Sequence, residues 1–321
     1  MTRLEGARVV VTGGAGFIGS HLVDSLLDAG VEQVGVVDSF FLGKDENLVD
    51  AVARGGRVTV FREDAGDAGA MHAVCNQIQP DVVFNLATKA LLYSFFNPAG
   101  ACRVNLDIAL TLCELLREGA FGRLVHLSSS EVYGTAQYVP MDENHPLLAE
   151  TTYAAGKAAA DLAVASYVRM FDLDAITVRP FNNYGPRQND QAFAAVIPLI
   201  VRRILAGVAP VIEGDGEQTR DFIFVHDTVD AILRLAVHDR ARGEVLNLGS
   251  GIETSIGSIV RTVASIMGWQ GEIDHAPARA ADVRRHCADV GHAEALVGPL
   301  ATTSLEDGLA ATVGWYRREP Q

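Results

Sequence analysis

Apolar runs of strand length alternate with segments of helix length through the first half of the chain. The strand-like runs are Val9–Val11, Gln33–Val37, Val58–Phe61, Val82–Leu86, Leu124–Leu127 and Ala175–Val178. The helix-like segments between them are Ser20–Ala29, Ala68–Gln79, Val104–Glu118 and Thr152–Phe171. Nearly continuous Val, Leu and Ile indicate strands that are covered on both faces, as in a parallel sheet. The alternation therefore predicts a doubly wound α/β domain.

The composition of the sequence changes after Arg179. The stretches RPFNNYGPRQND and EGDGEQTRD are rich in Gly, Pro, Asn and charge, which is typical of loops over a site. The segment Asp221–Asp239 has the pattern of a strand and a helix that return to the first sheet. We predict two domains: residues 1–180 with about 221–247 form the α/β domain, and about 181–220 with 248–321 form a smaller, α-rich substrate domain.

Bulk composition excludes several classes of protein. The chain has 321 residues, 49% of them hydrophobic, which is enough for a large core. Its net charge of −14 argues against binding nucleic acid or an anionic membrane over the whole surface. No apolar run reaches the roughly 20 residues that span a bilayer, and the short run Ala90–Phe96 is predicted to form a buried wall. The N-terminus lacks the layout of a signal peptide, so the expected location is the cytoplasm.

The cysteines indicate neither a disulfide framework nor a metal site. Cys75, Cys102, Cys113 and Cys287 are scattered, without a CxxC pair or a His/Cys spacing that is typical of metal ligands. We expect these cysteines to be reduced and mostly packed, and we expect no bound metal.

A glycine-rich loop follows the first predicted strand, in the stretch VVVTGGAGFIGSHL. Gly13, Gly16 and Gly19 permit a tight turn and let backbone N–H groups approach a pyrophosphate at the start of a helix, although such turns also occur for structural reasons alone. The next strand ends at Asp38, a carboxylate suited to the ribose hydroxyls of NAD and repulsive to the extra phosphate of NADP. Asp64, after the third strand, is either an adenine contact or a solvated loop residue. Together these residues predict a dinucleotide site that prefers NAD.

Tyr153 and Lys157 lie in the stretch TTYAAGKAAADLA and share a face if that stretch is a helix. A phenol is a poor base at neutral pH because its pKa is near 10. A nearby ammonium group and the positive nicotinamide ring would favour the phenolate and lower that pKa. The pair could then take a proton from a sugar hydroxyl while hydride leaves the same carbon for NAD. The spacing alone is common by chance.

Several motifs occur in one order: the glycine loop, Asp38, NLAT after the fourth strand, SSSEVYG after the fifth, and YxxxK on the next helix. This order resembles the extended short-chain dehydrogenase/reductase family, specifically its NAD-dependent nucleotide-sugar epimerases and dehydratases. The resemblance continues through RPFNNYGPRQ, GDGEQTRDFIFVHD and RAADVRRHCAD, and so covers nearly the whole chain. It implies a Rossmann fold, bound NAD and a UDP- or dTDP-linked sugar as substrate. It also implies a homodimer that packs through the helices predicted at Val104–Glu118 and Thr152–Phe171.

The resemblance also implies roles for single residues. Ser129 would bond the sugar C4 hydroxyl beside the base Tyr153, and Lys157 would also hold the nicotinamide ribose. The candidate cofactor contacts are Gly13, Gly16, Phe17, Ile18, Gly19, Asp38, Asp64, Asn85, Leu86, Ala87, Lys89, Tyr153 and Lys157. The candidate substrate contacts are Asn182, Arg220 and Arg284, which would hold the diphosphate, and Arg187. The family more often has a neutral residue at Lys89, so the role of Lys89 stays open.

The residues that follow Ser129 bear on the type of reaction. A 4-keto group acidifies the hydrogen on C5, so elimination requires a carboxylate beside C5. Glu131 stands where the dehydratases and decarboxylases of the family carry Glu. Ser130 stands where dTDP-glucose dehydratases usually carry the Asp that protonates the departing hydroxyl, and serine is a far weaker acid. Glu131 favours a 4,6-dehydratase, with Ser129, Ser130, Glu131, Tyr153 and Lys157 as the candidate catalytic residues.

Other outcomes stay open. A 4-epimerase of the UDP-glucose/galactose type would need no further acid or base after oxidation at C4. A UDP-glucuronate decarboxylase would need a cation for the substrate carboxylate, but the stretch after Arg187 reads QNDQAFAAV and contains no Arg. A non-catalytic, NAD-sensing protein of the same fold would usually lack the Tyr153 and Lys157 pair.

Overall fold

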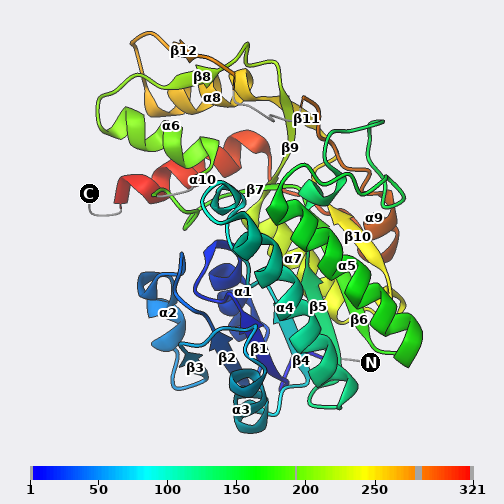
Figure 1. Ribbon diagram of the computed structural model, residues 1–321. Helices are drawn as coiled ribbons and strands as arrows, with labels where there is room; N and C mark the ends of the chain where they lie inside the picture. Colours follow the sequence, from blue (N-terminus) through cyan, green and yellow to red (C-terminus); the bar gives the residue numbers. More distant parts are fainter. Residues whose placement is uncertain (1–2, 192–193, 279–283, 319–321) are drawn as a thin grey trace.

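A seven-stranded parallel sheet forms the centre of the computed structural model, which describes residues 3–191, 194–278 and 284–318 (Figure 1). Its strands are β1 (Arg8–Thr12), β2 (Gln33–Val37), β3 (Val58–Phe61), β4 (Val82–Asn85), β5 (Arg123–Leu127), β6 (Ala175–Pro180) and β10 (Val245–Leu248). They lie in the order β10-β6-β5-β4-β1-β2-β3, and each neighbouring pair is parallel. The chain runs outward from β1 to β3 and then crosses back to β4. A crevice therefore opens at the carboxyl ends of β1 and β4, and the predicted doubly wound fold is confirmed.

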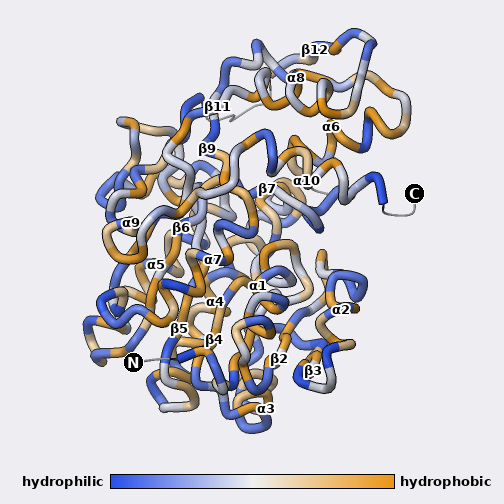
Figure 2. The backbone as a smooth tube through the Cα atoms, turned by 180° about the vertical axis from the view of Figure 1, so that it is seen from behind, coloured by the Kyte–Doolittle hydropathy of each residue, from blue (hydrophilic) through white to orange (hydrophobic). Residues whose placement is uncertain are grey.

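Helices cover both faces of this sheet, because alternate strand residues point to opposite sides. The helices are α1 (Phe17–Asp28), α2 (Val49–Val52), α3 (Ala68–Ile78), α4 (Pro98–Arg117), α5 (Thr152–Phe171) and α7 (Val225–Ala236). Val9 and Val11 belong to the core that is shared with α1 and α7. Val10, between them, belongs to the core that is shared with α3, α4 and α5. The view from behind shows the strands as hydrophobic segments inside the molecule (Figure 2).

The smaller part of the molecule lies above the carboxyl ends of the large sheet in Figure 1. Its elements are β7 (Asn182–Tyr184), α6 (Val196–Leu205), β8 (Val211–Glu213), β9 (Thr219–Phe224), β11 (Glu253–Ser255), α8 (Ile256–Met267), β12 (Asp274–Ala276) and α10 (Leu305–Arg318). β9 lies between β7 and β11 in a three-stranded sheet, and β8 pairs with β12. Apolar side chains of α6, α8 and α10 form a core of their own. The remaining helix, α9 (Gly291–Val297), packs back against the core of α1 and α7.

Three segments differ from the sequence-based predictions. β9 joins the small sheet rather than the large one, and the strand that adds to the large sheet is β10, which follows α7. Ala90–Phe96 is not a buried wall: it contains the 3-10 helix η2 (Leu91–Phe95), and Phe95 and Phe96 are 66% and 76% exposed. This segment crosses from β4 to α4 above the sheet, so it borders the crevice. α4 begins at Pro98 rather than Val104, because the Asn97 side chain caps it by accepting from the N–H of Gly100.

Within the described ranges, the cysteines form no disulfide, no group of His, Cys, Asp and Glu is arranged to hold a metal, and no helix is long and apolar enough to cross a membrane. Burial raises the pKa of the Cys75 and Cys113 thiols to about 11 and about 12. Both thiols therefore stay protonated at neutral pH and pack as small apolar groups.

Candidate active site

A cavity of about 380 Å³ lies at the carboxyl ends of β1, β2, β4 and β5. It collects most of the predicted cofactor contacts: Gly13, Gly16, Phe17, Ile18, Gly19, Asp38, Asp64, Leu86, Ala87, Lys89, Tyr153 and Lys157. Ser129 and Arg187 also line it. The point at which the strand order reverses thus brings together side chains from motifs that are far apart in the sequence.

Asn85 differs from the other predicted cofactor contacts because it does not line this cavity. Its side chain is buried within the sheet, where its oxygen accepts from Thr12 Oγ1 at 2.7 Å. Its amide nitrogen donates to His126 Nδ1 at 2.9 Å. Both ends of the amide are thus used inside the protein, and Asn85 supports the floor of the crevice from below.

Glycine is required at two positions of the loop between β1 and α1. Gly13 has a φ of +69°, and a Cβ there would lie 2.8 Å from the backbone nitrogen of Ala87. A Cβ on Gly19 would lie 2.1 Å from the carbonyl oxygen of Gly13. Both distances are too short for any side chain, so the loop packs directly on the chain beyond β4. The N-terminus of α1 is left facing the cavity, which is the cradle that a pyrophosphate requires.

Asp38 is held in a fixed position at the end of β2. Its carboxylate accepts from the N–H groups of Ala15 at 3.0 Å and Phe40 at 2.8 Å. Burial raises the pKa of this carboxyl, and the two backbone donors and the nearby Lys89 ammonium oppose that shift. A carboxylate fixed in this way can accept from the ribose hydroxyls of a dinucleotide without rearranging.

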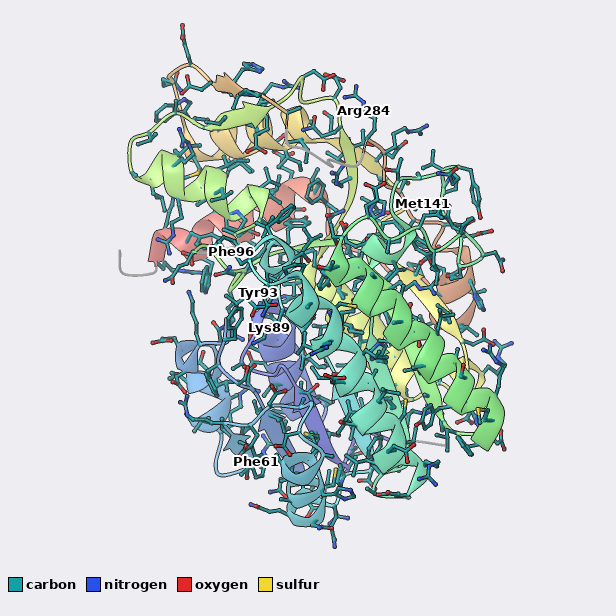
Figure 3. All side chains as sticks on the ribbon, viewed as in Figure 1. Phe61, Lys89, Tyr93, Phe96, Met141 and Arg284 are labelled. Carbon is teal, nitrogen blue, oxygen red and sulfur yellow. The ribbon has the colours of Figure 1, made fainter. Side chains whose placement is uncertain are left out.

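Lys89 covers one end of the cavity. Its Nζ lies 3.7 Å from the centre of the Phe41 ring, and Phe41 meets the Tyr93 ring edge-on at a centroid distance of 5.3 Å. Figure 3 shows Lys89, Tyr93 and Phe96 in succession along the border between the two parts of the molecule. The ammonium of Lys89 therefore lies beside Asp38 and joins the segment after β4 to the loop after β2.

Ser129, Tyr153 and Lys157 meet at the other end of the cavity. Tyr153 and Lys157 lie one turn apart near the start of α5. Lys157 Nζ donates to the carbonyl of Leu127, the last residue of β5, at 2.7 Å. The Tyr153 phenol has the hydroxyls of Ser129 and Thr88 as hydrogen-bonding neighbours. The strand end and the helix together hold a hydroxyl, a phenol and an ammonium around one point.

The pKa of Tyr153 differs from the sequence-based expectation, which was that the nearby Lys157 ammonium would lower it. Burial raises the pKa of Tyr153 to about 12, and the nearby Glu131 carboxylate adds to the rise. Burial lowers the pKa of Lys157 to about 8, although Asp161 opposes that shift. The chain by itself therefore holds a neutral phenol at neutral pH, because desolvation outweighs the hydrogen bonds of Ser129 and Thr88, which lower the pKa of Tyr153. A phenolate requires the further positive charge of an oxidised nicotinamide ring.

Ser130 and Glu131 open the 3-10 helix η3 (Ser130–Tyr133). The Oγ of Ser129 accepts from the N–H of Glu131 at 3.3 Å, which ties the start of η3 to the end of β5. Ser130 is buried, and neither residue lines the cavity. The Glu131 carboxylate nevertheless lies close enough to Tyr153 to act on its pKa.

The four predicted substrate contacts are not brought together. Asn182 and Arg220 line a second cavity, of about 440 Å³, among β7, β9 and α6. Arg187 instead lines the first cavity and pairs with Asp24 at 2.7 Å. Arg284 is exposed, pairs with Asp215 at 2.9 Å, and lies toward the outer end of the smaller part (Figure 3). The RAADV stretch that precedes Arg284 lies outside the described residues.

Comparison with known proteins decides the family. Residues 10–312 match the family described as GDP-mannose 4,6 dehydratase. The chain is 35% identical to UDP-glucose 4-epimerase of Mycolicibacterium smegmatis, over 98% of this chain and 100% of the relative. It is 33% identical to dTDP-glucose 4,6-dehydratase of an Actinoplanes species, over 97% and 98%. The crystal structure of Thermotoga maritima UDP-glucose 4-epimerase with UDP-glucose is similar with a TM-score of 0.91, at 31% identity over 97% and 98%. The chain belongs to the NAD-dependent nucleotide-sugar epimerases and dehydratases.

Three polar residues near this epimerase/dehydratase site escaped the sequence analysis: Thr88, Asn105 and Asn183. Thr88 and Asn183 line the first cavity, and Thr88 donates to Asn105 Oδ1 at 2.7 Å. Thr88 and Asn183 lie within the motifs NLAT and RPFNNYGPRQ, but those motifs gave neither residue a role of its own. Asn105 could have been noticed as a candidate, because it is a polar residue among the apolar residues on the buried face of α4. It is only 2% exposed. A buried amide needs partners, so its position pointed to a polar neighbour across the helix.

Gly19→Ala is expected to weaken NAD binding by this family member about tenfold or more and to destabilise the fold by about 1–3 kcal/mol. The physical reason is the contact that its Cβ would make with the Gly13 carbonyl. Calorimetric titration of NAD and thermal unfolding measure the two effects. Gly314→Ala, in α10, is the matched control, because a Cβ there meets nothing within 4 Å. Unchanged NAD affinity in Gly19→Ala would contradict the role assigned to the loop.

Proposed function

We propose that this protein is an NAD-dependent 4,6-dehydratase of a UDP- or dTDP-linked hexose, which acts through a 4-keto intermediate. The observation that carries the proposal is the set Ser129, Tyr153 and Lys157 at one end of the first cavity, with the Glu131 carboxylate close to Tyr153. The first three supply the oxidation at C4 that all members of the family share. Glu131 supplies the base that elimination requires in addition.

The first cavity fits NAD by the chemistry of its lining. The glycine loop between β1 and α1 would receive the pyrophosphate, and Asp38 would accept from the hydroxyls of the adenosine ribose. Lys157 would reach the nicotinamide ribose, since it lies beside the reacting tyrosine. When bound, NAD accepts hydride from C4 of the sugar and returns it at the end of the reaction.

The proton steps at C4 belong to Tyr153. Its phenol oxygen takes the proton of the C4 hydroxyl, and Ser129 orients that hydroxyl by hydrogen bonding. The Lys157 ammonium favours the phenolate electrostatically, and the Leu127 carbonyl fixes its position. Burial of the group keeps water away from the reacting oxygen.

Glu131 and Ser130 would act after the C4 carbonyl has formed. The carboxylate of Glu131 removes the proton from C5, and the C6 hydroxyl departs as water. The proton that completes this water is the one that Tyr153 took from the C4 hydroxyl, passed on directly or through solvent. Ser130 stands next to this step with a hydroxyl, which can orient the departing group but is a weak acid. In the final step the hydride is returned to C6, and Glu131, after its proton has exchanged with solvent, protonates C5, so the chain is regenerated.

A 4-epimerase is the second candidate, and two observations favour it. Ser130 places no strong acid beside the departing hydroxyl, and the similar M. smegmatis and T. maritima proteins are UDP-glucose 4-epimerases. A uronate decarboxylase is less well supported, since Asp190 rather than a cation follows Arg187. The Asp190 carboxylate pairs with Lys44 and Arg202. This stretch therefore offers a carboxylate that is already neutralised by two cations, and no cation of its own for a uronate carboxylate.

The mass of the product separates these reactions. The purified protein, loaded with NAD, is incubated with a panel of UDP- and dTDP-linked hexoses and uronic acids. Loss of water is expected for the dehydratase, and unchanged mass with inverted C4 indicates the epimerase. Loss of carbon dioxide indicates the decarboxylase. Binding of NAD without conversion of any nucleotide sugar would contradict the enzymatic proposal and favour an NAD-sensing protein.

We further propose a homodimer that packs through α4 and α5, which lie side by side on the outer face of the sheet (Figure 1). The Ala-rich face of α5 packs inside the monomer, where a Cβ on Gly156 would lie 2.4 Å from the carbonyl oxygen of Cys102 on α4. The opposite side of the pair exposes Leu110 and Leu162, which a second copy would cover. Sedimentation velocity is expected to show a dimer that Leu162→Glu dissociates; a wild-type monomer at micromolar concentration would contradict this.

A further inference from the structure

The loop after β2 is fastened at both ends to the glycine loop. At its start, the Asp38 carboxylate accepts from the N–H of Ala15 at 3.0 Å. At its far end, the N–H of Lys44 and Asn47 Nδ2 donate to the carbonyl of Ala15 at 3.1 Å and 2.9 Å. Phe41 lies between these anchors, lines the first cavity and is 41% exposed. The loop therefore holds an apolar ring at the edge of the cavity, close in the chain to the carboxylate that suits a ribose.

Partners for this ring come from the segment between β4 and α4. Lys89 Nζ lies 3.7 Å from the centre of the Phe41 ring, and the Tyr93 ring meets that ring at a centroid distance of 5.3 Å and an angle of 72°. Both geometries are favourable, because the face of an aromatic ring carries negative charge and its edge carries positive charge. The Tyr93 hydroxyl in turn accepts from Asn97 Nδ2 at 3.1 Å, and Asn97 caps α4. Tyr93 is thus anchored at the start of α4, and Figure 3 shows it beside Lys89 at the border of the two parts of the molecule.

The strand order places this contact across the cavity. β1 lies between β4 and β2 in the sheet, and the glycine loop follows β1. A contact between the segment after β4 and the loop after β2 must therefore pass above the carboxyl end of β1. A dinucleotide whose pyrophosphate lies on the glycine loop and whose ribose meets Asp38 lies beneath this contact. Lys89 and Phe41 both line the cavity, so their contact closes it above the adenosine half of the cofactor.

We propose that Phe41, Lys89 and Tyr93 form a strap over the cofactor cavity, which opens each time NAD enters or leaves. The Lys89 ammonium then acts on the Phe41 ring rather than on a phosphate of NAD, which gives a role to a residue that the family resemblance left open. The strap acts on the binding of NAD, so it does not depend on which of the candidate reactions follows.

Slow exchange of NAD suits the chemistry of this family. In each of the candidate reactions, hydride that leaves C4 returns to the sugar within the same turnover, so NAD is regenerated and need not leave. Loss of the reduced cofactor between these two steps would strand the keto intermediate. A contact of charge and ring across the cavity, between groups that belong to the protein, slows that loss without adding a bond to the cofactor.

Phe41→Leu and Lys89→Met test the strap, because each removes one partner of the contact and keeps most of the side-chain volume. The protein is loaded with radiolabelled NAD and chased with excess unlabelled NAD for the dissociation rate constant, and a filter-binding time course gives the association rate constant. Both rate constants are expected to rise about threefold to tenfold in each variant. Kd should change by less than about twofold, because the strap opens for entry as well as for exit.

Conservative variants and a double variant test the pairing. Lys89→Arg and Phe41→Tyr should keep slow exchange, because a guanidinium and a phenol ring support the same contact. The double variant Phe41→Leu/Lys89→Met should exchange NAD no faster than either single variant, since both remove one shared interaction. Phe95→Leu is the matched control: Phe95 lies on the same segment, is 66% exposed and does not line the cavity, so wild-type rate constants are expected.

The opposite assignment of Lys89 gives a different pattern. If its ammonium held a phosphate of NAD, Lys89→Met would raise Kd without faster association, and Phe41→Leu would leave both rate constants unchanged. Either result overturns the proposal, and so do additive effects in the double variant. Should Phe41→Leu fail to fold, Lys89→Met and Lys89→Arg decide alone. The measurement needs no turnover, so a protein inert toward every nucleotide sugar would refute the proposed function and leave the result on the strap readable.

Discussion

Tyr153→Phe is expected to lower turnover of the nucleotide sugar by about 10³-fold and to leave NAD binding unchanged. The substitution removes only the phenol oxygen, and the ring keeps its buried position at the start of α5. The C4 hydroxyl then has no base beside it, because the Lys157 ammonium is held on the Leu127 carbonyl and cannot take its place. Steady-state kinetics measure the loss, and the absorbance of reduced nicotinamide after mixing reports the oxidation step directly.

Tyr167→Phe is the matched control for this prediction. Tyr167 lies on the same helix, and its phenol donates to the Glu114 carboxylate near the surface, away from the cavity. Full activity is expected in this variant. If Tyr153→Phe kept more than about a tenth of the wild-type turnover, another group would have to remove the proton, and the assignment of the base would be wrong.

Glu131→Gln is expected to stop a dehydratase after oxidation at C4. The amide keeps the size and the hydrogen bonds of the side chain but cannot take the C5 proton, so product formation should fall by about 10²–10³-fold. Reduced nicotinamide should accumulate, because the later hydride return depends on elimination. In deuterated water the wild-type product should carry deuterium at C5, and the variant should incorporate almost none.

The same variant separates the two candidate functions. A 4-epimerase uses no base at C5, so Glu131→Gln should then keep nearly full turnover and the wild-type product should contain no deuterium at C5. Glu32→Gln, at an exposed position before β2, controls for the loss of one negative charge. Retained turnover in Glu131→Gln would therefore remove the dehydratase proposal and leave the shared oxidation at C4 intact.

The fold was predictable because its signals are local in the sequence. Continuous apolar runs identify strands that are covered on both faces, and the glycine loop identifies the first strand, turn and helix. The strands β1 to β6 lie at or within a few residues of the predicted runs. The partner of β9 was not predictable in the same way. The sequence of β9 is compatible with either the large or the small sheet. Its position between β7 and β11 depends on the path of the chain after β6.

Long-range contacts likewise explain the error about the exposure of Ala90–Phe96. The run Ala90–Phe96 has the composition of a buried wall, yet it lies above the sheet at the mouth of the crevice. The pairing of Arg284 with Asp215 is another contact that no motif specifies, and the role of Arg284 toward a diphosphate stays a prediction. Composition and motif describe what a side chain can do, whereas the neighbours that it meets depend on the whole path of the chain.

The sequence by itself determined the α/β class, the dinucleotide loop with Asp38, and the pairing of Tyr153 with Lys157, because spacing along a strand or a helix decides which side chains share a face. Only the tertiary structure decided how that pair is protonated. Burial in the folded protein raises the pKa of Tyr153 and lowers that of Lys157, and burial is a property of packing rather than of spacing. The structure alone also placed Thr88, which lines the cavity, against Asn105, since these residues come from the segment after β4 and from α4 and meet only in the fold.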